Sequence, residues 1–226
     1  YEGIVKVLID KGFEPGQHFA CCPEFRDFYI LEEIRNYAQT VTIACSDYSD
    51  PSKTRYSRAG GGIYRYHIGP NEIEKLHTGF FRQMVKTPSV IYAVDFVERF
   101  LYTFDHDFKV LDKRPLDHPN YCGVAYCPDR KIIALINAGD DTISIHDEAS
   151  FRCEERIEFS DKHFDKQTSN HHLNDCCIVG NRIYVSYFSL TGTWKLGNYD
   201  GGVSELHLDK LIEGSQQVAS DLWMPH

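Results

Sequence analysis

The residues best suited to catalysis or ligand binding lie in short polar strings, two of which stand before a run of apolar and β-branched residues. Three strings carry histidine: Asp117-His118-Pro119-Asn120, Asn170-His171-His172-Leu173-Asn174-Asp175 and Met224-Pro225-His226. Imidazole, amide and carboxylate groups together can bind a divalent metal such as calcium, or hold a polar ligand such as a sugar. Histidine can also act as an acid or base near neutral pH.

These strings supply a set of candidate site residues. His172 and His226 are candidate acid–base residues, and Asn174 with Asp175 are candidate metal ligands. The candidate ligand-binding residues are His118, Asn120, His171, Trp194 and Tyr199. A structural interpretation stays open for each, because polar residues at strand starts often bind only backbone groups or water.

The elements that would position these residues are short strands. From residue 41 onward, runs rich in β-branched and aromatic residues alternate with turn residues, which predicts a β meander. The expected strands are Val41–Cys45, Ile63–Ile68, Val90–Val97, Phe100–Phe104, Phe108–Leu111, Gly123–Tyr126, Ile132–Ile136, Thr142–Ile145 and Ile183–Phe188.

An internal repeat refines the fold class. Ile43-Ala44-Cys45-Ser46 aligns with Ile183-Tyr184-Val185-Ser186, and Gly61-Gly62-Ile63 aligns with Gly201-Gly202-Val203, both at an offset of 140 residues. Three periods in that span are about 47 residues each, the length of a four-stranded propeller blade. The sequence therefore predicts an all-β protein, a β-propeller with blades at 41–79, 88–117, 120–160 and 171–220. A β-sandwich is the alternative, but it predicts no such repeat.

The propeller arrangement would gather the candidate residues. In a propeller the first strand of each blade lines the channel, so we expect blade starts to converge on one opening. Thr87-Pro88-Ser89 is the fourth expected start, and the string from Asp221 to His226 is the expected start of a further blade. The chain is thus predicted to be a partial ring of about four blades.

Two long insertions accompany the repeat, at 47–60 and 190–200, and each ends in glycines that let the backbone turn back into a strand. They either shape a binding surface or fold back on their blade. Residues 1–40 differ from the rest, because Ile4, Val7 and Leu8 have helical spacing. We therefore expect a short α-containing N-terminal segment over 1–40 and the blades over 41–226.

Composition excludes some functions. A net charge of −9 and a pI near 5.6 argue against nucleic-acid binding. No apolar stretch reaches the ~20 residues of a membrane-spanning helix. The eight cysteines form no CxxC pair, so buried free thiols in a reducing compartment are expected, and with them a cytoplasmic location.

Residues 171–208 also carry a resemblance. His171-His172-Leu173-Asn174-Asp175, the string from Gly180 to Ser186, Gly201-Gly202-Val203 and the terminal Met224-Pro225-His226 resemble an uncharacterised bacterial propeller-like family. Members are often found among surface-polysaccharide biosynthesis genes, which implies a sugar-linked role. Asn174-Asp175 and the string from Gly180 are also similar to the six-bladed regucalcin and gluconolactonase class, which implies a six-bladed parent and a channel calcium. The histidines here, and the lack of an evident channel glutamate, depart from that class.

Three hypotheses for function follow. The first is a propeller whose channel mouth binds a small polar ligand, a glycan or sugar nucleotide. The second is a metal-dependent hydrolase, lactonase or lyase at the same mouth. The third is a protein-interaction scaffold that uses the Trp194 and Tyr48 loops. Whether the chain is an enzyme stays open.

Overall fold

The part of the chain that the structure describes consists mainly of antiparallel β-sheets. The computed structural model describes residues 40–45, 61–67, 70–160, 170–198 and 200–222. Two short 3-10 helices, η2 (Trp194–Leu196) and η3 (Leu211–Glu213), interrupt the strands. Within the described ranges, no helix is long and apolar enough to cross a membrane.

Three sheets have four antiparallel strands each, and the strands follow one another in chain order. Blade 2 comprises β4 (Phe81–Lys86), β5 (Ile91–Asp95), β6 (Phe100–Phe104) and β7 (Val110–Pro115). Blade 3 comprises β8 (Tyr121–Cys127), β9 (Ile132–Asn137), β10 (Thr142–Asp147) and β11 (Cys153–Glu158). Blade 4 comprises β12 (Leu173–Val179), β13 (Arg182–Tyr187), β14 (Gly201–His207) and β15 (Gln216–Leu222).

A further sheet, blade 1, comprises β1 (Thr40–Cys45), β2 (Gly62–His67) and β3 (Glu72–Thr78) in that order. The 140-residue repeat places β1 on β13 and β2 on β14, so blade 1 corresponds to the three outer strands of blade 4. The counterpart of β12 falls before Thr40, outside the described residues. Contacts divide the chain into two compact units, Tyr1–Ile43 with Tyr64–Glu74 and Ala44–Ile63 with Lys75–His226. Blades 2, 3 and 4 belong to the second unit.

Burial within a blade follows the composition of its strands. All six residues of β9, Ile-Ile-Ala-Leu-Ile-Asn, are buried, as expected for a strand covered on both faces. The outer strand β11, Cys-Glu-Glu-Arg-Ile-Glu, is exposed except for Ile157. The inner strands therefore supply the core, and charged residues occupy the outer edge.

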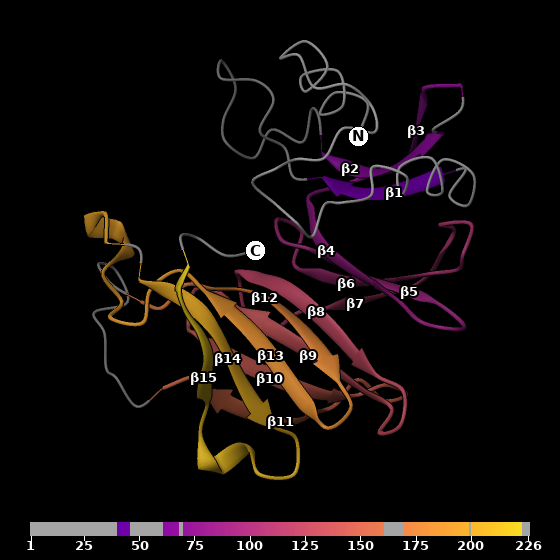
Figure 1. The fold of residues 1–226 in the computed structure, drawn as a ribbon. Coiled ribbons are helices and arrows are strands. Elements are labelled where there is room, and N and C mark those ends of the chain that lie inside the picture. The colour runs from indigo at the N-terminus through magenta and orange to yellow at the C-terminus, as the bar shows by residue number, and fades with distance from the viewer. Residues whose placement is uncertain (1–39, 46–60, 68–69, 161–169, 199, 223–226) are drawn as a thin grey trace, which may run out of the picture. The chain divides into compact units, whose positions relative to one another are not determined.

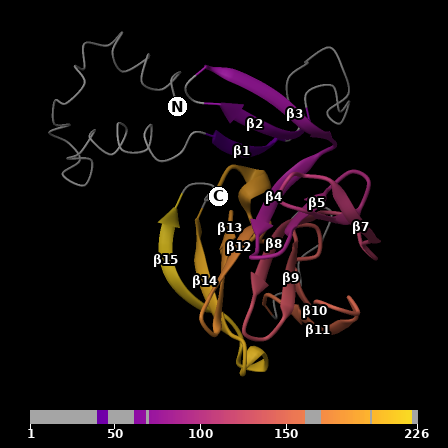
Figure 2. The same cartoon turned by 90° about the vertical axis from the view of Figure 1, so that its right-hand side faces the viewer.

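The blades of the second unit pack face to face with their first strands adjacent. β8 lies beside β4 on one side and β12 on the other (Figures 1 and 2). Tyr92, Leu101 and Val124 belong to an apolar cluster shared by blades 2 and 3. Ile136, Leu173 and Val185 belong to a second cluster, shared by blades 3 and 4. Consecutive four-stranded meanders stacked in this way form the blades of a β-propeller, which confirms the predicted fold class.

A polar side chain links the first strands of all three blades. Each first strand has a β-bulge near its start, which brings Gln83, Gly123 and Asp175 to corresponding positions. The Gln83 side chain accepts a hydrogen bond from the Val124 N–H and donates one to the Cys176 carbonyl. A Cβ at position 123 would lie 3.2 Å from the Gln83 Oε1, so glycine leaves room for this side chain to pass.

One predicted blade start is wrong. Blade 2 begins with β4 rather than at residue 88, and Thr87-Pro88-Ser89 forms the turn between β4 and β5. There the Thr87 N–H donates to the Val90 carbonyl at 2.8 Å, and the Thr87 Oγ1 accepts from the Val90 N–H. Proline at the second position of this turn explains the error, since it mimics a blade start. Of the expected further start, Asp221 and Leu222 belong to the outer strand β15, and residues 223–226 lie outside the described residues.

Several other predictions concern residues that the structure does not describe. The helical segment expected over 1–40 lies outside the described residues except for Thr40, and all of the 47–60 insertion lies outside them. Six cysteines are described and all are free thiols. Cys122, Cys127 and Cys176 are buried as expected, whereas Cys153 and Cys177 are exposed. The exposed pair corrects the expectation that the thiols are buried.

Candidate functional site

A tight turn between β9 and β10, residues 137–141, lies at the end of blade 3 where β8 begins. The Asn137 side chain accepts hydrogen bonds from the Gly139 and Asp140 N–H groups, which fixes the turn. Its amide donates to the Pro119 carbonyl at 2.9 Å, and the Ala138 N–H donates to the Asn120 carbonyl at 3.0 Å. The start of β8 is thereby attached to the turn.

The other side of the same turn contacts the start of blade 4. The Asn170 side chain donates to the Ala138 carbonyl at 2.6 Å. The Asp141 carboxyl accepts from the His171 N–H at 2.6 Å and from the Leu173 N–H at 3.3 Å. The starts of blades 3 and 4 are thus neighbours across one turn.

Asp141 is a buried carboxyl, 8% exposed, and its φ of 53° lies in the left-handed region. Burial raises its pKa to about 6, although the backbone N–H groups of residues 171–173 act in the opposite direction. Removing a carboxylate from water disfavours the charged form, and here that cost exceeds the gain from the hydrogen bonds. The side chain faces backbone donors, so its position supports a structural role.

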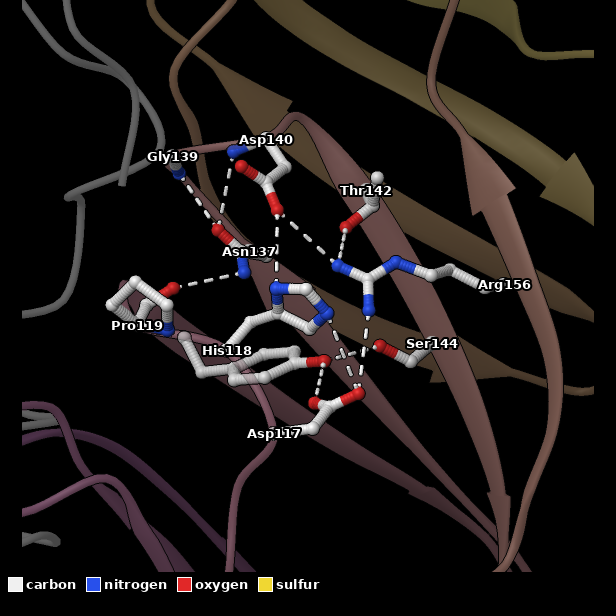
Figure 3. A network of polar contacts seen from close by, with 10 residues as sticks. Asp117, His118, Pro119, Asn137, Gly139, Asp140, Thr142, Ser144 and Arg156 are labelled. Carbon is white, nitrogen blue, oxygen red and sulfur yellow. Dashed lines mark hydrogen bonds and ion pairs between the residues drawn. The ribbon is translucent and has the colours of Figure 1, made fainter.

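Three charged side chains surround the partly exposed His118 beside this turn (Figure 3). The His118 Nδ1 lies 3.7 Å from the Asp140 Oδ2, and its Nε2 lies 3.6 Å from the Asp117 Oδ2. Arg156, from the outer strand β11, reaches the same two carboxylates at 3.3 and 3.5 Å. The imidazole and the guanidinium are therefore both placed between two carboxylates.

This network extends inward through hydroxyl groups. The buried Tyr121 hydroxyl donates to the Asp117 Oδ1 at 3.0 Å and lies 2.9 Å from the Ser144 hydroxyl. Burial raises the pKa of Tyr121 to about 12, so the phenol stays protonated at neutral pH. Thr142 accepts a hydrogen bond from the Arg156 guanidinium. The outer half of the network stays accessible, since the His118 side chain is 44% exposed.

Aromatic rings lie on the blade 4 side of the turn. The His172 ring is 4.5 Å from both the Phe188 and the Trp194 rings, measured between centroids. The Trp194 indole donates to the Asn170 Oδ1 at 2.8 Å. Asn170 therefore connects the indole to the 137–141 turn, and the 190–198 loop folds back on the start of its own blade.

The adjacent histidine has a different environment. His171 is 1% exposed, and its Nε2 lies 2.7 Å from the Ser160 hydroxyl while its Nδ1 lies 2.9 Å from the Ser189 carbonyl. Its ring packs edge-on against Phe159 and Tyr187. Both ring nitrogens thus have partners within the protein, an arrangement suited to fixing the start of β12.

Asn174 and Asp175, the predicted metal ligands, lie in the bulge of β12. Asn174 is 7% exposed, and the Asp175 Oδ1 accepts a hydrogen bond from the Cys176 N–H at 2.7 Å. Among the described residues, no group of three His, Cys, Asp or Glu side chains is placed to hold a metal ion. Calcium takes six to eight oxygen ligands, which this donor set does not supply. The residues here do not fit the calcium site implied by the lactonase resemblance.

The structure brings His118, Asn120, His171, His172 and Trp194 to one turn. Tyr199 and His226 lie outside the described residues. Three further members of the network were not predicted: Asp117, Asp140 and Arg156. The signal for Asp117 was its place in the string before β8. No sequence pattern pointed to Arg156, because it comes from the outer strand of the sheet.

Comparison with known proteins adds only a distant structural likeness. No protein-family model and no curated protein matches the sequence. Saccharomyces cerevisiae Sqt1 superposes with a TM-score of 0.46 at 8% identity, over 71% of this chain and 42% of that one. Kuenenia stuttgartiensis hydrazine synthase gives 0.46 at 14% identity, over 64% and 37%. The chain thus spans about two fifths of the length of these proteins. The fold assignment rests on the strand order and blade packing described above.

Proposed function

We propose that this propeller binds a small, hydroxyl-rich ligand of the sugar class at the 137–141 turn. The observation that carries the proposal is the partly exposed Asp117–His118–Asp140–Arg156 network at a turn that Asn170 connects to the His172–Trp194 ring pair. Sugar hydroxyls donate to carboxylates and accept from guanidinium or imidazole N–H groups. Sugar rings also bury their apolar faces against aromatic side chains, and Trp194 offers such a surface.

Two features of the turn favour binding. The network members come from three elements held together by hydrogen bonds. Ligand binding would therefore cost little conformational entropy. The bacterial family that the blade 4 strings resemble is found with polysaccharide genes, which agrees with a sugar-linked role. A glycan or a sugar nucleotide would both present the required hydroxyls.

The alternatives have less support. Metal-dependent hydrolysis lacks a fitting set of ligands among the described residues. A scaffold that captures partners through the Trp194 loop has only the exposure of that loop in its favour, and the indole N–H is hydrogen-bonded to Asn170 at the start of its own blade. Neither observation favours a second function over sugar binding.

The test is saturation-transfer NMR with glucose, glucuronic acid and UDP-glucose as probes. We expect transfer from the wild-type chain for at least one probe, and a loss of affinity of about ten-fold in Asp140→Asn and in Trp194→Leu. Asp129→Asn, an exposed turn carboxylate outside the network, is the matched control and should bind as wild type does. Absence of transfer from wild type, or equal affinity in Asp140→Asn and Asp129→Asn, would refute the proposal.

A further inference from the structure

A second surface feature lies at the opposite end of blades 3 and 4, where β9 begins and β14 ends. A cleft of about 350 Å³ is lined there by Arg130, Ile132, Ile145, Glu154, Glu155, Leu208 and Leu211. The four aliphatic side chains are each less than 10% exposed and form the apolar floor. Its volume is at the lower end of the ~300–1,000 Å³ of ligand sites, so it suits one or two side chains.

The rim of the cleft is acidic. Glu155 pairs with Ile145 in the β10–β11 register, so its carboxylate projects from the same face of blade 3 as the apolar floor. Glu154 is the unpaired residue of the bulge in this register, and its carboxylate lies 3.6 Å from Arg152 at the exposed surface. Among the described residues, Glu155 forms no ion pair. A carboxylate beside an apolar cleft is complementary to a cation on an aliphatic stem.

The basic residue of the cleft is already paired. The Arg130 guanidinium forms an ion pair with Asp209 and donates to the Leu208 carbonyl at 3.3 Å. It therefore joins the β8–β9 turn to the end of β14 and closes one end of the cleft. Among the described lining residues, the carboxylate that remains outside an ion pair is that of Glu155, within a chain of net charge −9.

The sheet edge next to the cleft is also available. β11 is the outermost strand of blade 3, bonded to β10 on one side only, and five of its six residues are exposed. An outer strand of this kind can accept an extended peptide by main-chain hydrogen bonding, with pockets for alternate side chains giving specificity. The cleft lies where such a peptide would place one side chain.

We infer that this cleft and the β11 edge bind an extended peptide segment of a basic protein partner. An aliphatic side chain of the peptide occupies the floor between Ile145 and Leu211, and a lysine or arginine pairs with Glu155. The site is separate from the 137–141 turn and does not depend on the function proposed there.

Fluorescence anisotropy with a fluorescein-labelled Lys-Leu-Lys-Leu-Lys-Leu peptide and the full chain tests this inference. We expect saturable binding, weakened about five-fold in Glu155→Gln and more in Glu155→Lys. Asp107→Asn is the matched control, because it removes one negative charge from an exposed turn of blade 2, outside both the cleft and the β11 edge. Two labelled control peptides should bind weakly. The first has glutamate in place of each lysine and so lacks the positive charges, and the second has serine in place of each leucine and so lacks the aliphatic side chains.

Three results would overturn the inference. The first is an absence of saturable binding by the Lys-Leu peptide. The second is equal weakening by Glu155→Gln and Asp107→Asn, which would mean general attraction of a cation to an acidic chain. The third is a concentration-dependent dimer in sedimentation that Glu155→Lys dissociates, because the occupant would then be a second copy of this chain.

Discussion

The two ends of the interface between blades 3 and 4 have opposite chemistry. At the end where β8 and β12 begin, backbone and side-chain hydrogen bonds connect the two blades through the 137–141 turn. At the other end, the blades meet over buried Ile132, Ile145 and Leu208, and an exposed Arg130–Asp209 pair forms the polar link. One core supports both ends.

This difference indicates that the two ends of the interface have different roles. Buried donors such as the His171 N–H must be satisfied within the protein, so the turn end fixes the relation of the blades. The cleft end contributes mainly apolar contact, and its exposed groups remain available to a partner. We therefore expect mutations at the turn to change stability and mutations at the cleft rim to change binding.

The largest effect is expected for Asp141→Ala. Alanine removes the acceptor of the His171 and Leu173 N–H groups, which would then be buried without partners. The expected loss in unfolding free energy is roughly 3–5 kcal/mol at pH 5, from urea denaturation. Asp129→Ala, at an exposed turn, should change the value by less than about 0.5 kcal/mol. A small loss in Asp141→Ala would show that the turn does not fix the blades.

The second prediction concerns pH. The pKa of Asp141 is about 6 in the folded state, above its unfolded value of 3.8. At pH values between these two, the folded state therefore binds the proton more tightly than the unfolded state does. Its contribution to stability is complete below about pH 4 and is lost as pH rises through about 6. Asp141→Asn does not titrate, so wild type should lose about 2–3 kcal/mol relative to this variant between pH 4 and 7. Urea denaturation at both pH values measures it, and pH-independent differences would contradict it.

The sequence predicted the blades better than their boundaries. β9 is a nearly continuous apolar run and β10 alternates isoleucines with polar residues, both between turn residues, and both were predicted. The outer strands β7 and β11 are charged along most of their length, so hydrophobic periodicity gives no signal for β11 and only a partial one for β7. β4, Phe-Arg-Gln-Met-Val-Lys, lacks a clear alternation, and its omission led to the misplaced start at Thr87.

The sequence predicted the site residues that stand before first strands, but not those that come from other parts of the sheet. His118, Asn120 and His172 were identified because each directly precedes a first strand. Asp140 and Arg156 complete the network from a turn and from the outer strand of the same blade, and sequence spacing carries no information about that convergence. The burial of His171 depends on Ser160 and Ser189, which no motif links to it.

At the cleft end, Arg130→Met should lower the free energy of unfolding only slightly. Its partner Asp209 is 55% exposed and Arg130 itself 35%, and ion pairs at such positions contribute about 0–1 kcal/mol. Methionine retains much of the aliphatic stem that packs along the cleft. Urea denaturation should therefore give a loss below about 1 kcal/mol. A loss as large as that of Asp141→Ala would mean that both ends hold the blades equally.

The smallest effect is a difference in thiol reactivity between the two ends. Cys122 and Cys127 are both buried in the core shared by blades 3 and 4. The Cys122 Sγ lies 3.4 Å from the Leu173 carbonyl near the turn end, whereas Cys127 pairs with Ile132 at the cleft end.

Burial also raises the pKa of Cys122 to about 12, which keeps its thiol protonated. Because apolar contacts and an exposed ion pair open more readily than a buried hydrogen-bond network, we expect N-ethylmaleimide to modify Cys127 about ten-fold faster than Cys122. Peptide mass spectrometry after short pulses measures both, and the exposed Cys153 provides the fast reference. Equal rates at Cys122 and Cys127 would mean that the blades separate as one unit, with neither end holding more firmly than the other.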